Sequence, residues 1–304
     1  MNALFITGPT SAGKTGIAIR VAELCNGEIV GADAFQVYKE LDILSAKPSR
    51  SDRARVPHHL IGVVPILQGY DVAQYLDAAR SSIADIVARG KFPVVCGGTG
   101  LYLRALIRGL SDLPKADASL RTELDGASLD DLQRRYTALD PAGAARIDLK
   151  NKRRLVRAIE VCILTQKPFS SFRDEWKTPA KNVTAFLLTR ERDDLHERIN
   201  RRVVEMFHSG AVEEVRQLTH AGATAIQAIG FGGIRALIAG ECTEAECIAC
   251  VQQATRRYAK RQLTWFRREP GFETINLTQC SDLELVAAQI AKKGVEISDG
   301  GLVT

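Results

Sequence analysis

The segment Gly8–Thr15, with the sequence GPTSAGKT, has the residue types of a loop that binds phosphate. It matches the pattern GxxxxGK[ST], follows the apolar run ALFIT and precedes a helix-like stretch. Gly8 and Gly13 permit a backbone that turns several N–H groups toward one anion, and Lys14 adds a positive charge. The amino end of the next helix adds partial positive charge, and the Thr15 hydroxyl suits Mg²⁺. The sequence therefore predicts a phosphate site made of Gly8, Pro9, Thr10, Ser11, Ala12, Gly13, Lys14 and Thr15.

A loop of this kind usually serves a nucleoside triphosphate, whose chemistry also needs an acid at the end of a neighbouring strand. The apolar run FPVVC ends instead in GGTGLY, which contains no acid. The acid that does follow a predicted strand is Asp33, in IVGADAFQVY. Parallel sheets place their chemistry at the carboxyl ends of strands, so Asp33 is a candidate Mg²⁺ ligand or general base. The alternative is a capping residue in a loop, and these residues leave open which phosphate is bound.

Strand-like and helix-like segments alternate along most of the chain. Apolar runs predict strands at 3–7, 28–32, 92–96, 183–188 and 272–277. Helix-like stretches separate them at 14–25, 72–89, 193–218 and 243–268. This alternation predicts an α/β fold, a P-loop-type parallel sheet with helices on both faces. Residues 111–180 show helical patterning without a convincing strand, so we expect a helical insertion there and a catalytic core made of 1–110 and 181–304.

Composition excludes several classes of protein. The chain has 304 residues, of which 45% are apolar, enough to bury a core. No apolar run approaches the ~20 residues of a membrane helix, and the start lacks the basic and long apolar segments of a secretion signal. Seven irregularly spaced cysteines favour free thiols in a reducing compartment. We expect a cytoplasmic protein that does not bind membranes.

Positive charge is concentrated in two windows of a chain whose net charge is +5. Residues 150–157 (KNKRRLVR) carry five basic residues and no acid, and residues 256–268 (RRYAKRQLTWFRR) carry six and no acid. Such local basic stripes are typical of surfaces that meet polyanions, although many are only solvated helix faces. The aromatic residues beside the second window favour RNA as the partner.

Seven motifs occur in a fixed order: GPTSAGKT, DAFQVYKELDILSAKP, VPHHLI, VVCGGTGLYLRAL, NKRRLVRAIEV, AIGF and RRYAKRQLTWFRR. In this order the chain resembles the tRNA dimethylallyltransferases, also called tRNA isopentenyltransferases, from residue 4 to about 270. The resemblance implies transfer of a dimethylallyl group from dimethylallyl diphosphate to N6 of adenine 37 in tRNA, which releases diphosphate. The chain resembles the bacterial type, because it lacks the CxxC…HxxxH finger of eukaryotic relatives. We also expect a monomer that binds the anticodon stem-loop.

The resemblance also assigns roles to residues. Asp33 is implied to be the base for the adenine amine, and Thr99 to approach the reacting centre. Lys14 and Arg216 are implied to bind the diphosphate, with Thr15 holding Mg²⁺ on it. The residues implied to contact tRNA are Asp33, Ala34, Phe35, Gln36, Thr99, Arg121, Arg153, Arg154, Leu155, Val156 and Arg157.

Three other functions fit part of the pattern. An adenylate dimethylallyltransferase would prenylate free AMP, ADP or ATP, and competition between tRNA and AMP would reveal it. A nucleotide kinase would use the phosphate loop and Asp33 to transfer phosphate from ATP. A non-catalytic relative would bind RNA yet give no product with labelled dimethylallyl diphosphate. The helical insertion and the two basic windows favour a macromolecular acceptor.

Overall fold

The computed structural model describes residues 3–172 and 183–300, and for residues 297–300 it describes the backbone alone. The chain divides into two compact units, one of Met1–Ile107 with Ala180–Thr304 and one of Arg108–Pro179. The core boundary at 180/181 that the sequence predicts lies outside the described residues. No helix in the described ranges is both long and apolar enough to cross a bilayer.

The first unit contains a six-stranded parallel sheet in the order β3-β2-β4-β1-β5-β6. Its strands are β1 (Leu4–Thr7), β2 (Gly27–Gly31), β3 (His58–His59), β4 (Phe92–Gly97), β5 (Thr184–Thr189) and β6 (Phe272–Asn276). The predicted α/β class with a parallel sheet is confirmed. The sequence does not predict β3, because a two-residue strand is too short to show an apolar pattern.

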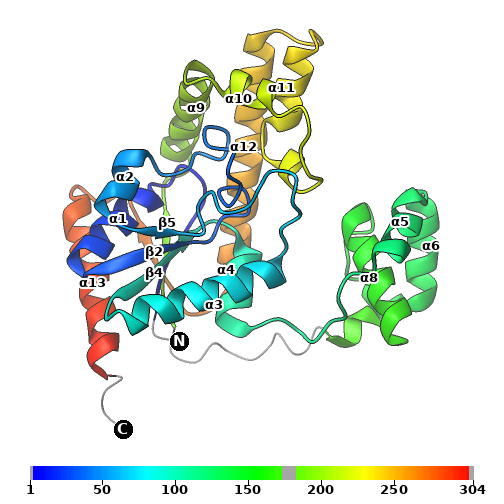
Figure 1. Ribbon diagram of the computed structural model, residues 1–304, viewed down its shortest axis with the longest axis horizontal. Helices are drawn as coiled ribbons and strands as arrows, with labels where there is room; N and C mark the ends of the chain where they lie inside the picture. Colours follow the sequence, from blue (N-terminus) through cyan, green and yellow to red (C-terminus); the bar gives the residue numbers. More distant parts are fainter. Residues whose placement is uncertain (1–2, 173–182, 301–304) are drawn as a thin grey trace. The chain divides into compact units, whose positions relative to one another are not determined.

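Helices cover both faces of this sheet (Figure 1). The helices of this unit are α1 (Lys14–Leu24), α2 (Arg50–Arg55), α3 (Val72–Ala88), α4 (Gly100–Arg108), α9 (Arg192–His208), α10 (Ala211–Gln217), α11 (Phe231–Ile238), α12 (Glu244–Phe266) and α13 (Leu283–Gly300), of which α10 and α11 pack on other helices beyond the sheet (Figure 1). A short 3-10 turn, η2, spans Ala225–Gln227. One apolar core joins α1 and α13 to the central strands, and it includes Ile6, Ile19 and Ile290, which are almost fully buried. This packing fixes the start of α1 at the end of β1.

Side chains cap α2, α3 and α12, whereas α1, α9, α10 and α11 begin without a side-chain cap. Asp71 at the start of α3 accepts hydrogen bonds from Ala73 N and Gln74 N, and Thr243 at the start of α12 forms a capping box with Glu246. The predicted helix 193–218 is two helices, because Gly210 adopts φ +97° and separates α9 from α10. At the start of α1, Gly13 provides no side-chain cap and the first turn holds no acid.

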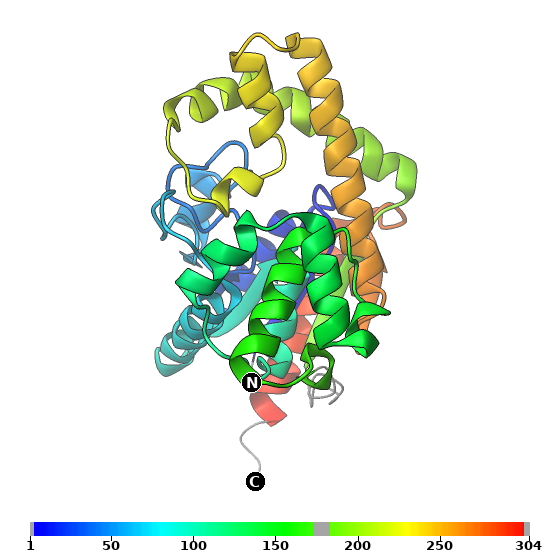
Figure 2. The same cartoon turned by 90° about the vertical axis from the view of Figure 1, so that its right-hand side faces the viewer.

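The second unit consists of helices in the part of it that the structure describes. They are α5 (Ala118–Gly126), α6 (Leu129–Leu139), α7 (Pro141–Ala144) and α8 (Lys152–Thr165), drawn in green in Figure 2. The face of α8 formed by Leu155, Ile159 and Cys162 packs with Leu132 and Tyr136 of α6 into a separate core. Spacing of i, i+4 and i+7 puts these α8 residues on one face, so the apolar pattern of the sequence becomes the core of this unit.

Candidate active site

Three loops leave the carboxyl ends of adjacent strands and are joined by backbone hydrogen bonds. The loop after β2 lies against the loop after β4, because Ala32 N donates to Cys96 O at 2.8 Å and Thr99 N donates to Ala32 O at 3.1 Å. Gly97 is required at this crossing, since a Cβ there would lie 2.1 Å from the carbonyl oxygen of Ala32. The third loop, Gly8–Thr15, follows β1, which pairs with β4. Asp33, Thr99 and the phosphate loop therefore share one edge of the sheet.

The phosphate loop has the backbone of an anion-binding turn. Gly8 adopts φ +147°, and a Cβ on it would lie 2.2 Å from the carbonyl oxygen of Leu188, so only glycine fits. Ser11 and Gly13 also have positive φ, at 63° and 102°. Helix α1 then begins at Lys14 without a side-chain cap. The first N–H groups of a helix have no intrahelical acceptor, so this end is suited to bind an anion.

Three cations, from different parts of the chain, lie at this loop: Lys14, Arg190 and Arg202. Arg190 donates from Nε to the carbonyl of Ala12 at 2.9 Å, and its Nη1 pairs with Asp194 at 2.8 Å. The ammonium of Lys14 donates to the carbonyl of Pro9 at 2.8 Å, and burial lowers its pKa to about 8 against the opposing charge of Asp33. The guanidinium of Arg202, on α9, donates from Nη1 to Thr10 Oγ1 at 2.9 Å and to Ser11 Oγ at 3.4 Å. Burial lowers the pKa of Arg202 too, and Asp33 again opposes the effect. Desolvated cations held by neutral groups favour an anionic ligand.

Asp33 both caps its loop and faces the cations. Its Oδ1 accepts hydrogen bonds from Phe35 N at 2.9 Å and Gln36 N at 3.3 Å. Asp33 therefore does cap its loop, as the alternative interpretation proposed. Capping uses Oδ1 alone, and no described hydrogen bond reaches Oδ2. Thr99 Oγ1 accepts from Ala34 N at 3.0 Å and so fixes the residue beside Asp33. A capped carboxylate with one oxygen left is suited to accept a proton at a fixed position.

Two further groups at this edge stay protonated at neutral pH. Burial raises the pKa of the Cys96 thiol to about 11, so this thiol is not a nucleophile here. Burial and the charge of Asp33 raise the pKa of the Tyr258 phenol on α12, although its hydrogen bond with Thr99 acts in the opposite direction. Asp33 thus remains the candidate base at this edge, with one carboxylate oxygen that no described hydrogen bond occupies.

Comparison with known proteins decides the family. A model of the family described as IPP transferase matches residues 36–269, most of the chain. This chain belongs to the IPP transferase family. The tRNA dimethylallyltransferase of Akkermansia muciniphila is 41% identical to it over 290 residues, which are 95% of this chain and 98% of the relative. The tRNA dimethylallyltransferase of Geobacter sulfurreducens is 44% identical over 284 residues, 90% of this chain and 91% of that protein.

Solved structures agree with this assignment to the IPP transferases. The full-length tRNA isopentenylpyrophosphate transferase of Bacillus halodurans superposes with a TM-score of 0.72 at 34% identity and covers 98% of this chain and 99% of its own. A eukaryotic dimethylallyltransferase, described as acting on tRNA, gives a TM-score of 0.81 at 27% identity over 98% of this chain and 79% of its own. The family resemblance seen in the sequence is confirmed.

The structure brings most of the predicted catalytic residues of this IPP transferase together. The phosphate loop, Asp33 and Thr99 lie at one edge, as the strand order requires. Gln36, predicted to contact tRNA, donates through Nε2 to the carbonyls of Ser45 and Ala46, at 3.3 and 3.0 Å, so its side chain holds the next loop. The RNA contacts of Ala34, Phe35 and Gln36 remain predictions.

Arg216 was predicted to bind the diphosphate, whereas Arg202 was not predicted at all. Arg216, on α10, pairs with Glu213 at 2.8 Å and its side chain is 57% exposed. No contact described for it involves the phosphate loop, so its diphosphate role remains a prediction without structural support. Arg202 and Arg190, neither of which was predicted from the sequence, are the arginines with described hydrogen bonds to the loop. The signal for Arg202 was weak, because α9 carries several arginines and helical spacing alone does not say which one faces the sheet.

In the helical unit, the predicted RNA residues separate into three groups. Arg121 and Arg157 both bind the fully buried carboxylate of Glu160, at 2.9 and 2.5 Å. Leu155 and Val156 lie in the core with exposures of 0% and 5%. Burial keeps their side chains from RNA, which corrects their assignment to an RNA surface.

Arg153 and Arg154 form the third group. They are exposed on the first turn of α8, and no ion-pair partner is described for either among the residues of this unit that the structure covers. Their predicted contact with tRNA therefore remains a prediction.

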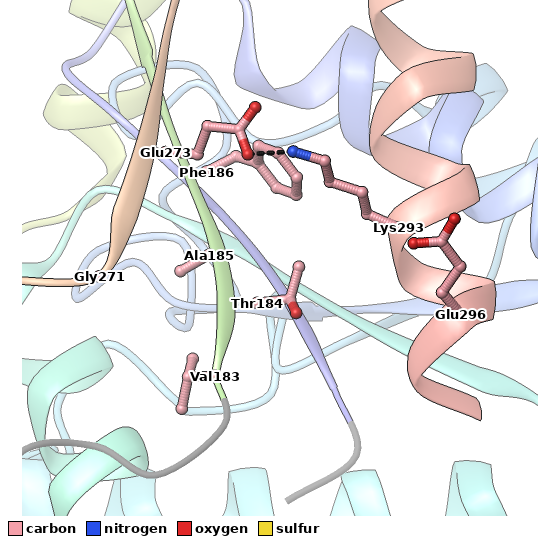
Figure 3. Close-up of a pocket in the computed structure, with 8 residues that line it drawn as sticks. All are labelled: Val183, Thr184, Ala185, Phe186, Gly271, Glu273, Lys293 and Glu296. Carbon is pink, nitrogen blue, oxygen red and sulfur yellow. Dashed lines mark hydrogen bonds and ion pairs between the residues drawn. The ribbon is translucent and has the colours of Figure 1, made fainter. Parts of the chain in front are cut away.

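A separate hollow of about 400 Å³ lies at the amino ends of β5 and β6, away from the catalytic edge (Figure 3). It is lined by Val183, Thr184, Ala185, Phe186, Gly271, Glu273, Lys293 and Glu296. Its cation, Lys293, pairs with Glu273 and lies 5.5 Å from the centre of the Phe186 ring. Two acids against one cation make this hollow unsuitable for a diphosphate.

Proposed function

We propose that this chain transfers a dimethylallyl group from dimethylallyl diphosphate to N6 of adenine 37 in tRNA. The names of the relatives indicate the class of reaction, and the site contains the cations and the carboxylate that this reaction needs. The observation that carries the proposal is the placement of Lys14 and Arg202 at one loop, with Asp33 close enough for its charge to act on both. An anion site beside a proton acceptor is what transfer from a diphosphate to an amine requires.

The reaction needs one bond to break and another to form at C1 of the isoprenoid. The C1–O bond to the diphosphate breaks, and its electron pair leaves with the diphosphate oxygen. The lone pair of adenine N6 forms the new C–N bond, and N6 gives a proton to Asp33 Oδ2. Lys14, Arg202 and the N–H groups at the start of α1 stabilise the negative charge that develops on the departing diphosphate.

Magnesium fits this site as a bound ion of the diphosphate. Mg²⁺ prefers oxygen ligands, keeps several waters and is commonly held by one or two protein groups together with phosphates. Thr15, at the first turn of α1, has no hydrogen bond described for its hydroxyl and is the residue that would hold the ion. When bound, Mg²⁺ would neutralise charge on the diphosphate. Among the described residues no group of three His, Cys, Asp or Glu side chains forms an all-protein metal site.

The acceptor is a macromolecule in this proposal, because each of the two units carries exposed basic residues. Arg153 and Arg154 are exposed on α8, and Arg257, Lys260 and Arg261 are exposed on α12. Cations of this kind bind the phosphate backbone and make affinity depend on salt. Adenines in single-stranded loops can be unstacked and held in a pocket, which suits modification at the anticodon loop.

One experiment tests the proposal. The protein is incubated with labelled dimethylallyl diphosphate, Mg²⁺ and an anticodon stem-loop with adenine at position 37, and the nucleosides are then analysed by mass. We expect N6-(dimethylallyl)adenosine from the stem-loop and none when position 37 is guanine. Preferential labelling of AMP in a mixture with the stem-loop would instead support an adenylate dimethylallyltransferase. Phosphoryl transfer from ATP would support a kinase.

A further inference from the structure

Gln262 on α12 joins two of the three catalytic loops through one side-chain amide. Its Oε1 accepts a hydrogen bond from Thr10 N at 2.9 Å, and its Nε2 donates to the carbonyl of Gly98 at 2.8 Å. The residue is only 6% exposed, so neither bond competes readily with water. The orientation of the amide is fixed by chemistry, because the N–H of Thr10 needs an acceptor and the carbonyl of Gly98 needs a donor.

Each of these two hydrogen bonds ends on a residue that carries, or is next in the chain to, a group of the proposed site. On the diphosphate side, Thr10 carries the hydroxyl that accepts from Arg202. On the acceptor side, Gly98 precedes Thr99, whose hydroxyl accepts from Ala34 N next to Asp33. Gln262 bonds to backbone atoms of Thr10 and Gly98, and neither of these bonds reaches Lys14, Arg202 or Asp33. It is therefore placed to act through the loops that it connects.

Helix α12 meets these loops at close range. A Cβ on Gly98 would lie 2.3 Å from the Gln262 amide nitrogen, and a Cβ on Gly100 would lie 2.4 Å from the Trp265 ring. Spacing of three residues puts Gln262 and Trp265 on the same face of the helix. Gly98 and Gly100 thus allow α12 to approach the loop after β4 so closely that the Gln262 amide can connect this loop to the phosphate loop.

We propose that Gln262 is a positioning residue that fixes the separation between the diphosphate loop and the Asp33–Thr99 side of the site. This inference rests on the proposed function, since it concerns alignment of the donor C1 carbon with the acceptor N6 atom. Reactions of two bound groups are sensitive to such alignment, and a displacement of about 1 Å costs about a hundredfold in rate. Binding of either substrate depends on one side of the site only, so the effect belongs in kcat more than in KM.

Two substitutions and a matched control test this role. Gln262→Met has similar length and removes both hydrogen bonds, whereas Gln262→Glu keeps the acceptor and loses the donor. Gln252→Met is the control, because Gln252 lies on the same helix and its amide donates to the Asn200 carbonyl of α9 at 3.1 Å, away from the loops. We expect kcat for transfer to the stem-loop to fall about 10- to 100-fold in Gln262→Met, with less than about threefold change in either KM.

Acidification adds a readout that a purely structural role would not change. In the Gln262→Glu variant, protonation gives the new carboxyl group both an acceptor and a donor, so its activity relative to the parent should recover as the pH falls. The parent shares Asp33, Lys14 and Arg202 and is measured at each pH, which removes their titration from the ratio. Gln252→Met should lower the melting temperature without changing the kcat of the folded enzyme.

The outcomes separate the two proposals. An active parent, with Gln262→Met indistinguishable from Gln252→Met in kcat, overturns the role of Gln262 alone. That role is equally overturned if Gln262→Met changes only the KM of dimethylallyl diphosphate, or if the relative activity of Gln262→Glu does not depend on pH. A parent that transfers nothing to the stem-loop overturns the proposed function, and this inference with it.

Discussion

Cations make side-chain hydrogen bonds in both units, but their partners differ. In the helical unit, Arg121 and Arg157 converge on the Glu160 carboxylate, which also accepts from Asp117 N at 2.9 Å. Burial alone would raise the pKa of Glu160, yet these hydrogen bonds outweigh it and the pKa lies below its ordinary value. At the phosphate loop, Lys14 and Arg202 are instead bound to a carbonyl and two hydroxyls.

The difference shows how to distinguish structural from functional cations. A cation that donates to a buried carboxylate is already neutralised, and its removal leaves the acid without a partner. A desolvated cation held by neutral groups is not neutralised by a bonded carboxylate. Burial therefore lowers its pKa, and binding of an anion would raise that pKa again. By this criterion Arg121 and Arg157 are structural cations of the helical unit, whereas Lys14 and Arg202 are candidates for binding an anion.

The largest expected effect comes from Asp33, whose charge acts on both Lys14 and Arg202. Asp33→Asn keeps an Oδ1 that can accept from Phe35 N and Gln36 N, so the loop should remain capped. The amide cannot take the proton from adenine N6, and we expect kcat to fall about 10²- to 10⁴-fold with an unchanged melting temperature. Single-turnover transfer to the stem-loop and thermal unfolding measure the two quantities. Undiminished turnover would exclude Asp33 as the base.

Neutralising a loop cation should weaken binding and spare the fold. Lys14→Met removes one charge-assisted contact to the diphosphate, so affinity for a non-reactive dimethylallyl thiolodiphosphate should fall about 10- to 100-fold. The melting temperature should stay equal or rise, because a desolvated charge is lost. Titration calorimetry and thermal unfolding provide the measurements. Arg121→Met is the matched control and should do the reverse, with lower stability and unchanged affinity.

Removing the acid from the helical unit tests the other half of the comparison. Glu160→Gln leaves Arg121 and Arg157 without their carboxylate, and these arginines can still reach water because their side chains are 42% and 30% exposed. We therefore expect a loss of about 2 kcal/mol in the free energy of unfolding, near the strength of hydrogen bonds to charged groups. Denaturant unfolding checks this value. A gain in stability, or weaker binding of the thiolodiphosphate, would contradict a structural role.

The smallest effect is a pH dependence of donor binding. The pKa of Lys14 is about 8 in the free protein, and a diphosphate favours its charged form. Affinity for the thiolodiphosphate should therefore hold below pH 8 and decline above it, by at most tenfold per pH unit. Lys14→Met should lack this decline between about pH 8 and about pH 9.5. Stability has the opposite sign, since the unfolded state binds more protons in this range and folding becomes more favourable as the pH rises.

Local patterns determined much of the catalytic edge in advance. The phosphate loop was readable because glycines at its two ends, a lysine and a strand before it form a pattern set by backbone geometry. Asp33 was readable because it follows an apolar run and parallel strands end at one edge, whereas Thr99 was implied by the family resemblance. The class of fold followed from the alternation of strands and helices, although β3 was too short to be seen.

Other members of the site could be found only in three dimensions. Arg202 and Gln262 lie far from the loop in sequence, and their contacts with Thr10 span 192 and 252 residues. Helical spacing places a residue on a face, but the packing of that helix decides what the face meets. The same holds in the helical unit, where the basic run at 150–157 contains a neutralised Arg157, two buried residues and two exposed arginines.

The sequence by itself determined the phosphate loop, the acid at the neighbouring strand end and the α/β architecture, because these depend on backbone conformation and apolar periodicity over short stretches. Only the tertiary structure decided which cations remain free for a ligand, since neutralisation depends on partners that the fold brings from distant segments. Lys14 and Arg202 are left for an anion, while Arg121 and Arg157 are neutralised by Glu160.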